Sequence, residues 1–275
     1  MLTFSGSLLL TFRELWALRL TQGMFAVATL AWLVLSLALK LDVVEGSLAA
    51  LRIFGMDAQP GGALPVGEFV LAVNQMVFGA AYFLGTLLGL FATMPLIGGL
   101  LESGRIDLLL SKPVSRSRIL GGHLAGLVLV VSALSTYLIG GVWLTLSLKT
   151  GIWETAFLAA IPLMVAMFVV MYGVLLFFTV LTRNAGLGLI VSYGLIFVSV
   201  ILAAHEQIRP QLDGVGLAVF STLYHVLPNF AEIARTVSQL ASPEGVSDVY
   251  PFISSLLFGG IVYAFSFRLF ARKDF

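Results

Sequence analysis

Long apolar stretches without charged side chains dominate this sequence. A helix needs about 20 mostly apolar residues to cross a hydrocarbon layer roughly 30 Å thick. Six stretches meet this requirement, and we place them at Gln22–Leu39, Phe69–Leu100, Leu124–Leu148, Thr155–Leu181, Asn184–Ala204 and Phe252–Phe267. The pattern predicts an all-α integral membrane protein with six transmembrane helices, organised as a single domain over residues 1–275.

The composition excludes several other classes of protein. Hydrophobic residues make up 59% of the chain and charged residues 11%, against about 45–50% and about 25% in soluble domains. These values exclude intrinsic disorder and a nucleic-acid-binding protein. The chain has no cysteine, so it forms no disulfide and offers no thiolate ligand or nucleophile. Its three histidines, His123, His205 and His225, show no metal-ligand spacing, so we expect no metal site.

The distribution of charge between the connections predicts the orientation. One side has ten basic and four acidic residues, which sum to +6; the other has five basic and ten acidic residues, which sum to −5. Basic residues collect in cytoplasmic connections. This rule places both termini and residues 101–121 of a multi-pass membrane protein in the cytoplasm. The basic residues of that side are Arg13, Arg19, Arg105, Lys112, Arg116, Arg118, Arg183, Arg268, Arg272 and Lys273.

The six stretches have no ionisable side chain in their interiors. Ion-coupled transporters usually have such a group within the membrane, although backbone carbonyls alone can hold an ion. Embedded hydrolases need a base or a carboxylate there, and voltage sensors need a series of arginines. The chain also lacks the Gly-x-x-x-x-Gly-Lys-Ser/Thr phosphate loop. We therefore expect a non-catalytic protein with no cofactor of its own, which works passively or takes energy from a partner.

Three polar or mixed segments lie outside the six apolar stretches. Residues 4–20 are predicted to form an amphipathic helix at the cytoplasmic interface, with Phe4, Leu8, Leu15 and Leu18 facing lipid, or else a frayed lead-in. Residues 205–251 are predicted to form a pair of outer helices broken near Pro228, which lie on or dip into the outer leaflet. We call residues 205–251 the outer segment. Residues 40–68 are predicted to be a second outer loop, with turns at Pro60 and Pro65.

Small residues in the membrane body predict close helix packing. Two Gly-x-x-x-Gly matches occur, at Gly85–Gly89 and at Gly122–Gly126. Such spacing lets helix backbones approach closely, but 28 glycines also produce matches by chance. The pattern alone leaves both interpretations open.

A dense polar stretch at residues 101–123 separates the second and third apolar stretches. Glu102–Leu110 is predicted to be a short amphipathic helix, and Pro113 disfavours helix at the residue before it. Ser115 is predicted to cap a helix whose first turn contains Arg116 and Arg118. A helix, a break and a second helix at the cytoplasmic face form a docking surface for a partner. The alternative is a solvated loop that satisfies the positive-inside rule.

The segment from Glu102 to Arg116 resembles the cytoplasmic signature of ABC-2 type permeases, where a Glu, a Gly, a Leu-rich run and Pro-x-Ser-Arg follow the second span. The N-terminal amphipathic helix, the six spans and the tail Phe270–Phe275 agree with that family. The resemblance implies a type V exporter-like permease fold and a pair of permease chains, identical or different. It also implies two separate ABC ATPase subunits, which bind ATP and Mg. Residues 101–121 would be the coupling segment, with Glu102, Arg105, Asp107 and Arg116 as the contacts to the ATPase.

The resemblance implies a permease subunit that exports a substrate along a path lined by the second and fifth spans. Because those spans are almost wholly apolar, an amphipathic or lipid-like substrate is favoured. One alternative is force transmission to an outer-facing, periplasmic or extracellular accessory protein without substrate passage. Another is a passive membrane scaffold or channel that works without any ATPase. Membrane lipid surrounds the chain in each case. None of these readings involves nucleic acid.

Overall fold

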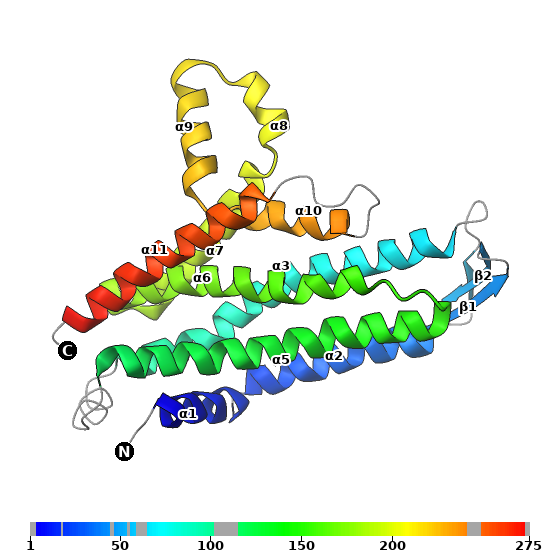
Figure 1. Cartoon of the computed structure of the whole chain (residues 1–275), viewed down its shortest axis with the longest axis horizontal. Helices are drawn as coiled ribbons and strands as arrows, with labels where there is room; N and C mark the ends of the chain where they lie inside the picture. The colour runs from blue at the N-terminus through cyan, green and yellow to red at the C-terminus, as the bar shows by residue number, and fades with distance from the viewer. Residues whose placement is uncertain are drawn as a thin grey trace.

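A computed structural model (Figure 1) describes residues 4–17, 19–44, 47–53, 56–58, 65–101, 115–240 and 249–272. Within these residues the membrane body is built of helices, and two 3₁₀ helices, η1 and η2, connect them. The helices, in chain order, are α1 (Phe4–Ala17), α2 (Arg19–Ala38), α3 (Val66–Leu100), α5 (Arg116–Thr150), η1 (Thr155–Ala159), α6 (Ala160–Thr182), α7 (Ala185–Leu202), α8 (His205–Ile208), η2 (Arg209–Gln211), α9 (Gly214–Val226), α10 (Phe230–Leu240) and α11 (Tyr250–Arg272).

Five of the described helices are long and apolar enough to cross a membrane. They are Val66–Leu100, Ser117–Thr150, Thr155–Thr182, Ala185–Leu202 and Tyr250–Arg272. The multi-pass helical body expected from the sequence is therefore confirmed. The first expected span falls on α2, whose apolar part, Thr21–Leu37, is shorter than the other five.

Helix α6 forms the centre of the bundle. It packs against α3, α5, α7 and α11, and its buried side chains include Met167, Met171 and Leu175. In Figure 1 the start of α1, the start of α5 and the end of α11 lie at one end of the bundle, and β1 lies at the other. Segments distant in the sequence are thus brought together at the end that holds both described termini.

Helix α1 packs against α5 more extensively than against α2, and it lies alongside the first part of α5 (Figure 1). Leu15 is 1% exposed and belongs to the main apolar core, so the expectation that Leu15 faces lipid is wrong. The amphipathic pattern was real, but a helix can bury its apolar face against protein as well as against lipid. Arg13, on the same helix, is exposed, as expected.

The outer connection after α2 contains a small antiparallel sheet rather than only a loop. Its strands are β1 (Leu39–Val44), β2 (Ser47–Ile53) and β3 (Met56–Ala58), in the order β1-β2-β3. Apolar and polar residues alternate in Leu39–Val43, which is the pattern of a strand with one covered face. Pro65, expected to mark a turn, stands at the residue before α3 begins.

The outer segment contains the expected helix pair. Helix α9 ends at Val226 and α10 begins at Phe230, so the break falls at Pro228, as predicted from the sequence. Figure 1 shows α8 and α9 projecting away from the bundle, whereas α10 lies against it. Helix α10 contacts α3, α6, α7 and α11.

Glycines allow close contact between α3 and α6. A Cβ atom on Gly89 would lie 2.7 Å from the Phe168 ring, and one on Gly85 would lie 3.0 Å from Met164. The first Gly-x-x-x-Gly match is therefore a packing face. In the second match, both Gly122 and Gly126 are buried in α5.

Candidate functional site

The segment expected to contact an ATPase lies between α3 and α5. Its residues Glu102, Arg105 and Asp107 lie outside the residues that the structure describes, and Arg116 is placed as the first residue of α5. Leu101 follows the last residue of α3, and its amide donates to the Gly98 carbonyl at 3.0 Å. The end of α3 and the start of α5 lie at the end of the bundle that holds both described termini (Figure 1).

Ser115 marks the start of α5, as expected, but its side chain does not cap the helix. Its backbone is extended, and its carbonyl accepts hydrogen bonds from the amides of Arg118 and Ile119 at 2.9 and 3.3 Å. The Ser115 hydroxyl instead accepts a long hydrogen bond, 3.5 Å, from the Ser117 hydroxyl. The prediction of the helix start is confirmed, and the prediction of a side-chain cap is wrong.

A buried histidine lies two turns into α5. His123 is 2% exposed, and its Nε2 lies 2.7 Å from the hydroxyl of Tyr172 on α6. It lies one residue before the predicted span Leu124–Leu148, within the longer apolar helix Ser117–Thr150. Helix α5 begins eight residues before the apolar stretch expected from the sequence.

The second and fifth spans, expected to line a transport path, lie side by side. The Tyr193 hydroxyl on α7 donates to the Leu87 carbonyl on α3 at 2.6 Å. Phe83 and Phe197 meet edge to face, with ring centroids 6.3 Å apart. Both helices also present apolar side chains away from the protein, and these are Met76, Leu84, Leu88 and Phe91 on α3 and Leu187, Ile190, Val200 and Ile201 on α7.

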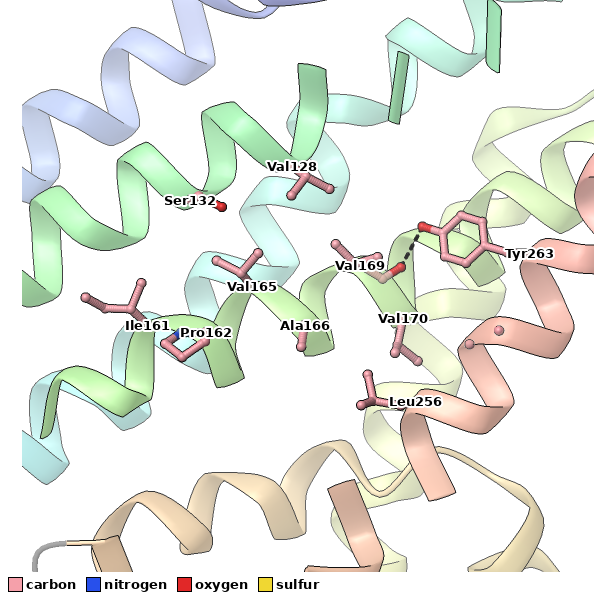
Figure 2. A pocket seen from close by; sticks show the side chains of 12 residues that line it. Val128, Ser132, Ile161, Pro162, Val165, Ala166, Val169, Val170, Leu256 and Tyr263 are labelled. Carbon is pink, nitrogen blue, oxygen red and sulfur yellow. Dashed lines mark hydrogen bonds between the residues drawn. The ribbon is translucent and has the colours of Figure 1, made fainter. Parts of the chain in front are cut away.

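A separate groove of about 520 Å³ lies between α5, α6 and α11. Figure 2 shows Val128 and Ser132 on one side of it and Leu256 and Tyr263 on another, with α6 between them. The Tyr263 hydroxyl donates to the Val169 carbonyl at 2.8 Å, so this hydroxyl already has an acceptor within the protein. The remaining lining is almost wholly apolar, which suits a hydrocarbon chain better than a sugar or an ion.

The two histidines of the outer segment, His205 and His225, both have their rings next to the ring of Tyr224. The ring of Tyr224 lies 4.5 Å from that of His205 and 5.3 Å from that of His225. The Tyr224 hydroxyl donates to the Glu232 carboxylate at 3.0 Å, and His205 Nδ1 lies 3.9 Å from that carboxylate. The sequence had suggested isolated histidines; their proximity depends on the fold of α8–α10. Among the described residues, no group of three or more metal-binding side chains occurs.

These features define a multi-pass helical membrane protein, in which a histidine–tyrosine pair is buried between α5 and α6 and several helices have exposed apolar faces. Residues 16–275 match the family described as ABC-2 family transporter protein. The chain therefore belongs to this family. Members of this family are generally non-catalytic membrane subunits that work with ABC ATPase subunits. No curated protein matches the chain.

Proposed function

We propose that this chain is the permease subunit of an ABC exporter, in which two permease chains and two separate ATPase subunits form the complex. The observation that carries the proposal is the family match over residues 16–275. The ATPases would bind ATP and Mg, and this chain would convert their closure into movement of its helices. The complex would lie in a bacterial inner membrane.

The arrangement of the helices supports six crossings with both termini in the cytoplasm. The start of α1 and the end of α11 lie at the same end of the bundle (Figure 1). A chain that begins and ends on one side crosses the membrane an even number of times. Five helices meet the length and hydropathy requirements, so α2 supplies the sixth crossing in this proposal. The excess of basic residues in the connections on that side agrees with the orientation.

The proposed substrate is amphipathic or lipid-like. The exposed faces of α3 and α7 are apolar, and in this proposal they line the path between two permease chains. Force transmission to an outer accessory protein is a second candidate function, supported by the projection of α8 and α9 from the bundle (Figure 1). Both functions use the same coupling segment, residues 101–121.

Alanine substitutions in the coupling segment test this proposal. We expect Glu102→Ala with Arg105→Ala to reduce association with the ATPase about tenfold, because each side chain would lose a charge-assisted hydrogen bond. Asp107→Ala and Arg116→Ala are expected to act in the same direction. The measurement is the amount of ATPase that copurifies with the tagged, full-length chain.

Arg268→Ala is the matched control, because Arg268 is an exposed basic residue in the last turns of α11 and outside the segment. This variant is expected to retain the ATPase. Unchanged ATPase recovery with the Glu102/Arg105 double variant, at equal yield of folded protein, would contradict the coupling assignment.

A further inference from the structure

The turn between α9 and α10 enters the helical bundle. Asn229 is 1% exposed and Phe230 is 0% exposed, although α9, immediately before them, has no buried residue. The Phe230 ring stacks on Tyr82 of α3, with centroids 4.3 Å apart and planes 21° from parallel. The ring of Phe83, one residue further along α3, lies 6.3 Å away. Asn229 and Phe230 are thus buried against the spans, and Ala231 is half-buried.

Three different spans each provide one hydroxyl group to the backbone of this turn. The Asn229 amide donates to Ser255 Oγ of α11 at 2.9 Å. The Phe230 carbonyl accepts a hydrogen bond from the Tyr82 hydroxyl of α3 at 2.8 Å. The Ala231 amide donates to Ser199 Oγ of α7 at 3.2 Å. We call Tyr82, Ser199 and Ser255 the outer clamp.

The two serines are suited to this role because each has its hydroxyl hydrogen already engaged. Ser255 donates to the Pro251 carbonyl at 2.6 Å, and Ser199 donates to the Ile196 carbonyl at 2.7 Å. The lone pairs of the two Oγ atoms are therefore available to accept hydrogen bonds from the amides of Asn229 and Ala231. The first amides of a helix have no acceptor within that helix, so Ser199 satisfies an early amide of α10 from a different helix. A buried amide without an acceptor is unfavourable, so loss of a clamp hydroxyl weakens the attachment of α10.

Further hydrogen bonds join α10 to the end of α7 and α9 to α10. Arg235 of α10 donates to the Ala203 carbonyl at the end of α7, at 2.9 Å. Tyr224 of α9 donates to Glu232 of α10 at 3.0 Å. Helices α9 and α10 are thereby joined to each other, and α10 is joined to α3, α7 and α11.

We propose that Tyr82, Ser199 and Ser255 are positioning residues that hold α9 and α10 to α3, α7 and α11, so that these helices move as one body during the transport cycle. This inference rests on the proposed export function for the cycle itself. It means that α9 and α10 are not an independent lid. The outer side of the path changes only when the three spans move together.

Distance measurements between spin labels test the proposal directly. The chain has no cysteine, so Met76→Cys on α3 and Val219→Cys on α9 label two exposed positions without removal of any native thiol. The labelled chain, in nanodiscs with its ATPase and an excess of unlabelled chain, gives the α3–α9 distance by pulsed electron paramagnetic resonance. Measurements are made without nucleotide and after trapping with ATP and vanadate.

The clamp variant combines Tyr82→Phe, Ser199→Ala and Ser255→Ala, which remove three hydroxyl groups and little volume. The control variant combines Tyr263→Phe, Ser192→Ala and Ser266→Ala. It also removes one tyrosine and two buried serine hydroxyls from the spans, but none of these contacts residues 229–231.

The unaltered chain and the control are expected to give one narrow distance distribution, the same in both nucleotide states. The clamp variant is expected to give a distribution about twofold broader, whose mean changes on trapping. A merely structural role would lower thermal stability equally in the clamp and control variants and leave nucleotide dependence unchanged. A clamp variant indistinguishable from the control, or a nucleotide-dependent distance in the unaltered chain, would overturn the proposal.

The experiment separates this inference from the proposed function. If no ATPase assembles with the chain, the export function fails. The comparison of distribution widths without nucleotide still decides whether the clamp holds α9 and α10: equal widths overturn it, and a broader clamp-variant distribution supports it.

Discussion

Gly188→Ala is expected to prevent α6 and α7 from packing closely. A Cβ atom at this position would lie 2.5 Å from Thr179 Oγ1 and 2.6 Å from the Leu175 carbonyl oxygen. Neither atom has room to move, because Thr179 is 0% exposed and donates to that same carbonyl at 2.6 Å. Overpacking of this kind costs about 3 kcal/mol, which corresponds to a fall of roughly 6–12 °C in Tm.

The measurement is thermal unfolding of the purified chain in mild detergent. Gly194→Ala is the matched control, because Gly194 lies on the same helix and a Cβ there would meet no atom within 4 Å. Since alanine favours helix over glycine by about 1 kcal/mol, the control is expected to unfold at an unchanged or higher temperature. Equal Tm values for the two variants would show that the α6–α7 interface is not as close as described.

Tyr172→Phe is expected to destabilise the protein by about 2 kcal/mol, because it removes the hydroxyl that pairs with His123 and leaves a buried polar group without that partner. Both residues are almost fully buried, and their polar atoms are 2.7 Å apart. His123→Leu is expected to have an effect of similar size, since it leaves the Tyr172 hydroxyl without the histidine.

A double-mutant cycle measures this interaction. We expect His123→Leu combined with Tyr172→Phe to cost less than the sum of the single variants, by about 1 kcal/mol or more, because the second substitution removes a group that has already lost this hydrogen bond. Additive effects on the free energy of unfolding would contradict the pairing. If the cycle shows coupling while ATP-driven function of the double variant persists, the pair stabilises the fold and is not required for function.

The sequence predicted the local features of the outer segment well. Pro228 disfavours a continuous helix wherever it occurs, so the break between α9 and α10 could be placed without a structure. The start of α5 at Arg116 was equally predictable, because Ser115 lies two residues after Pro113 and precedes a helical pattern. Features of this kind depend on residues adjacent in the chain.

Features that depend on distant residues were not predictable. The outer clamp joins Phe230 to Tyr82, 148 positions earlier in the chain, and a tyrosine hydroxyl in a span does not reveal which carbonyl it will contact. Leu15 was assigned to lipid because amphipathicity shows that a face is apolar and not what covers it. The proximity of His205 and Tyr224 likewise depends on how α8 and α9 fold back on each other.

The identity of the candidate coupling residues came from the sequence and not from the structure. Glu102, Arg105 and Asp107 were selected by resemblance to the family signature, and they lie outside the described residues. The family match over residues 16–275 supports the class of protein to which such a segment belongs. The contact between this segment and an ATPase remains a proposal that the alanine variants test.

The mass and composition of the complex, purified in mild detergent from its native membrane, test the central proposal most directly. The proposal predicts two membrane chains together with two ABC ATPase chains in stoichiometric amounts. The same measurement distinguishes a pair of identical permease chains from a pair of different ones. Recovery of this chain alone, without an ATPase in several detergents, would contradict the exporter assignment and favour a passive membrane scaffold.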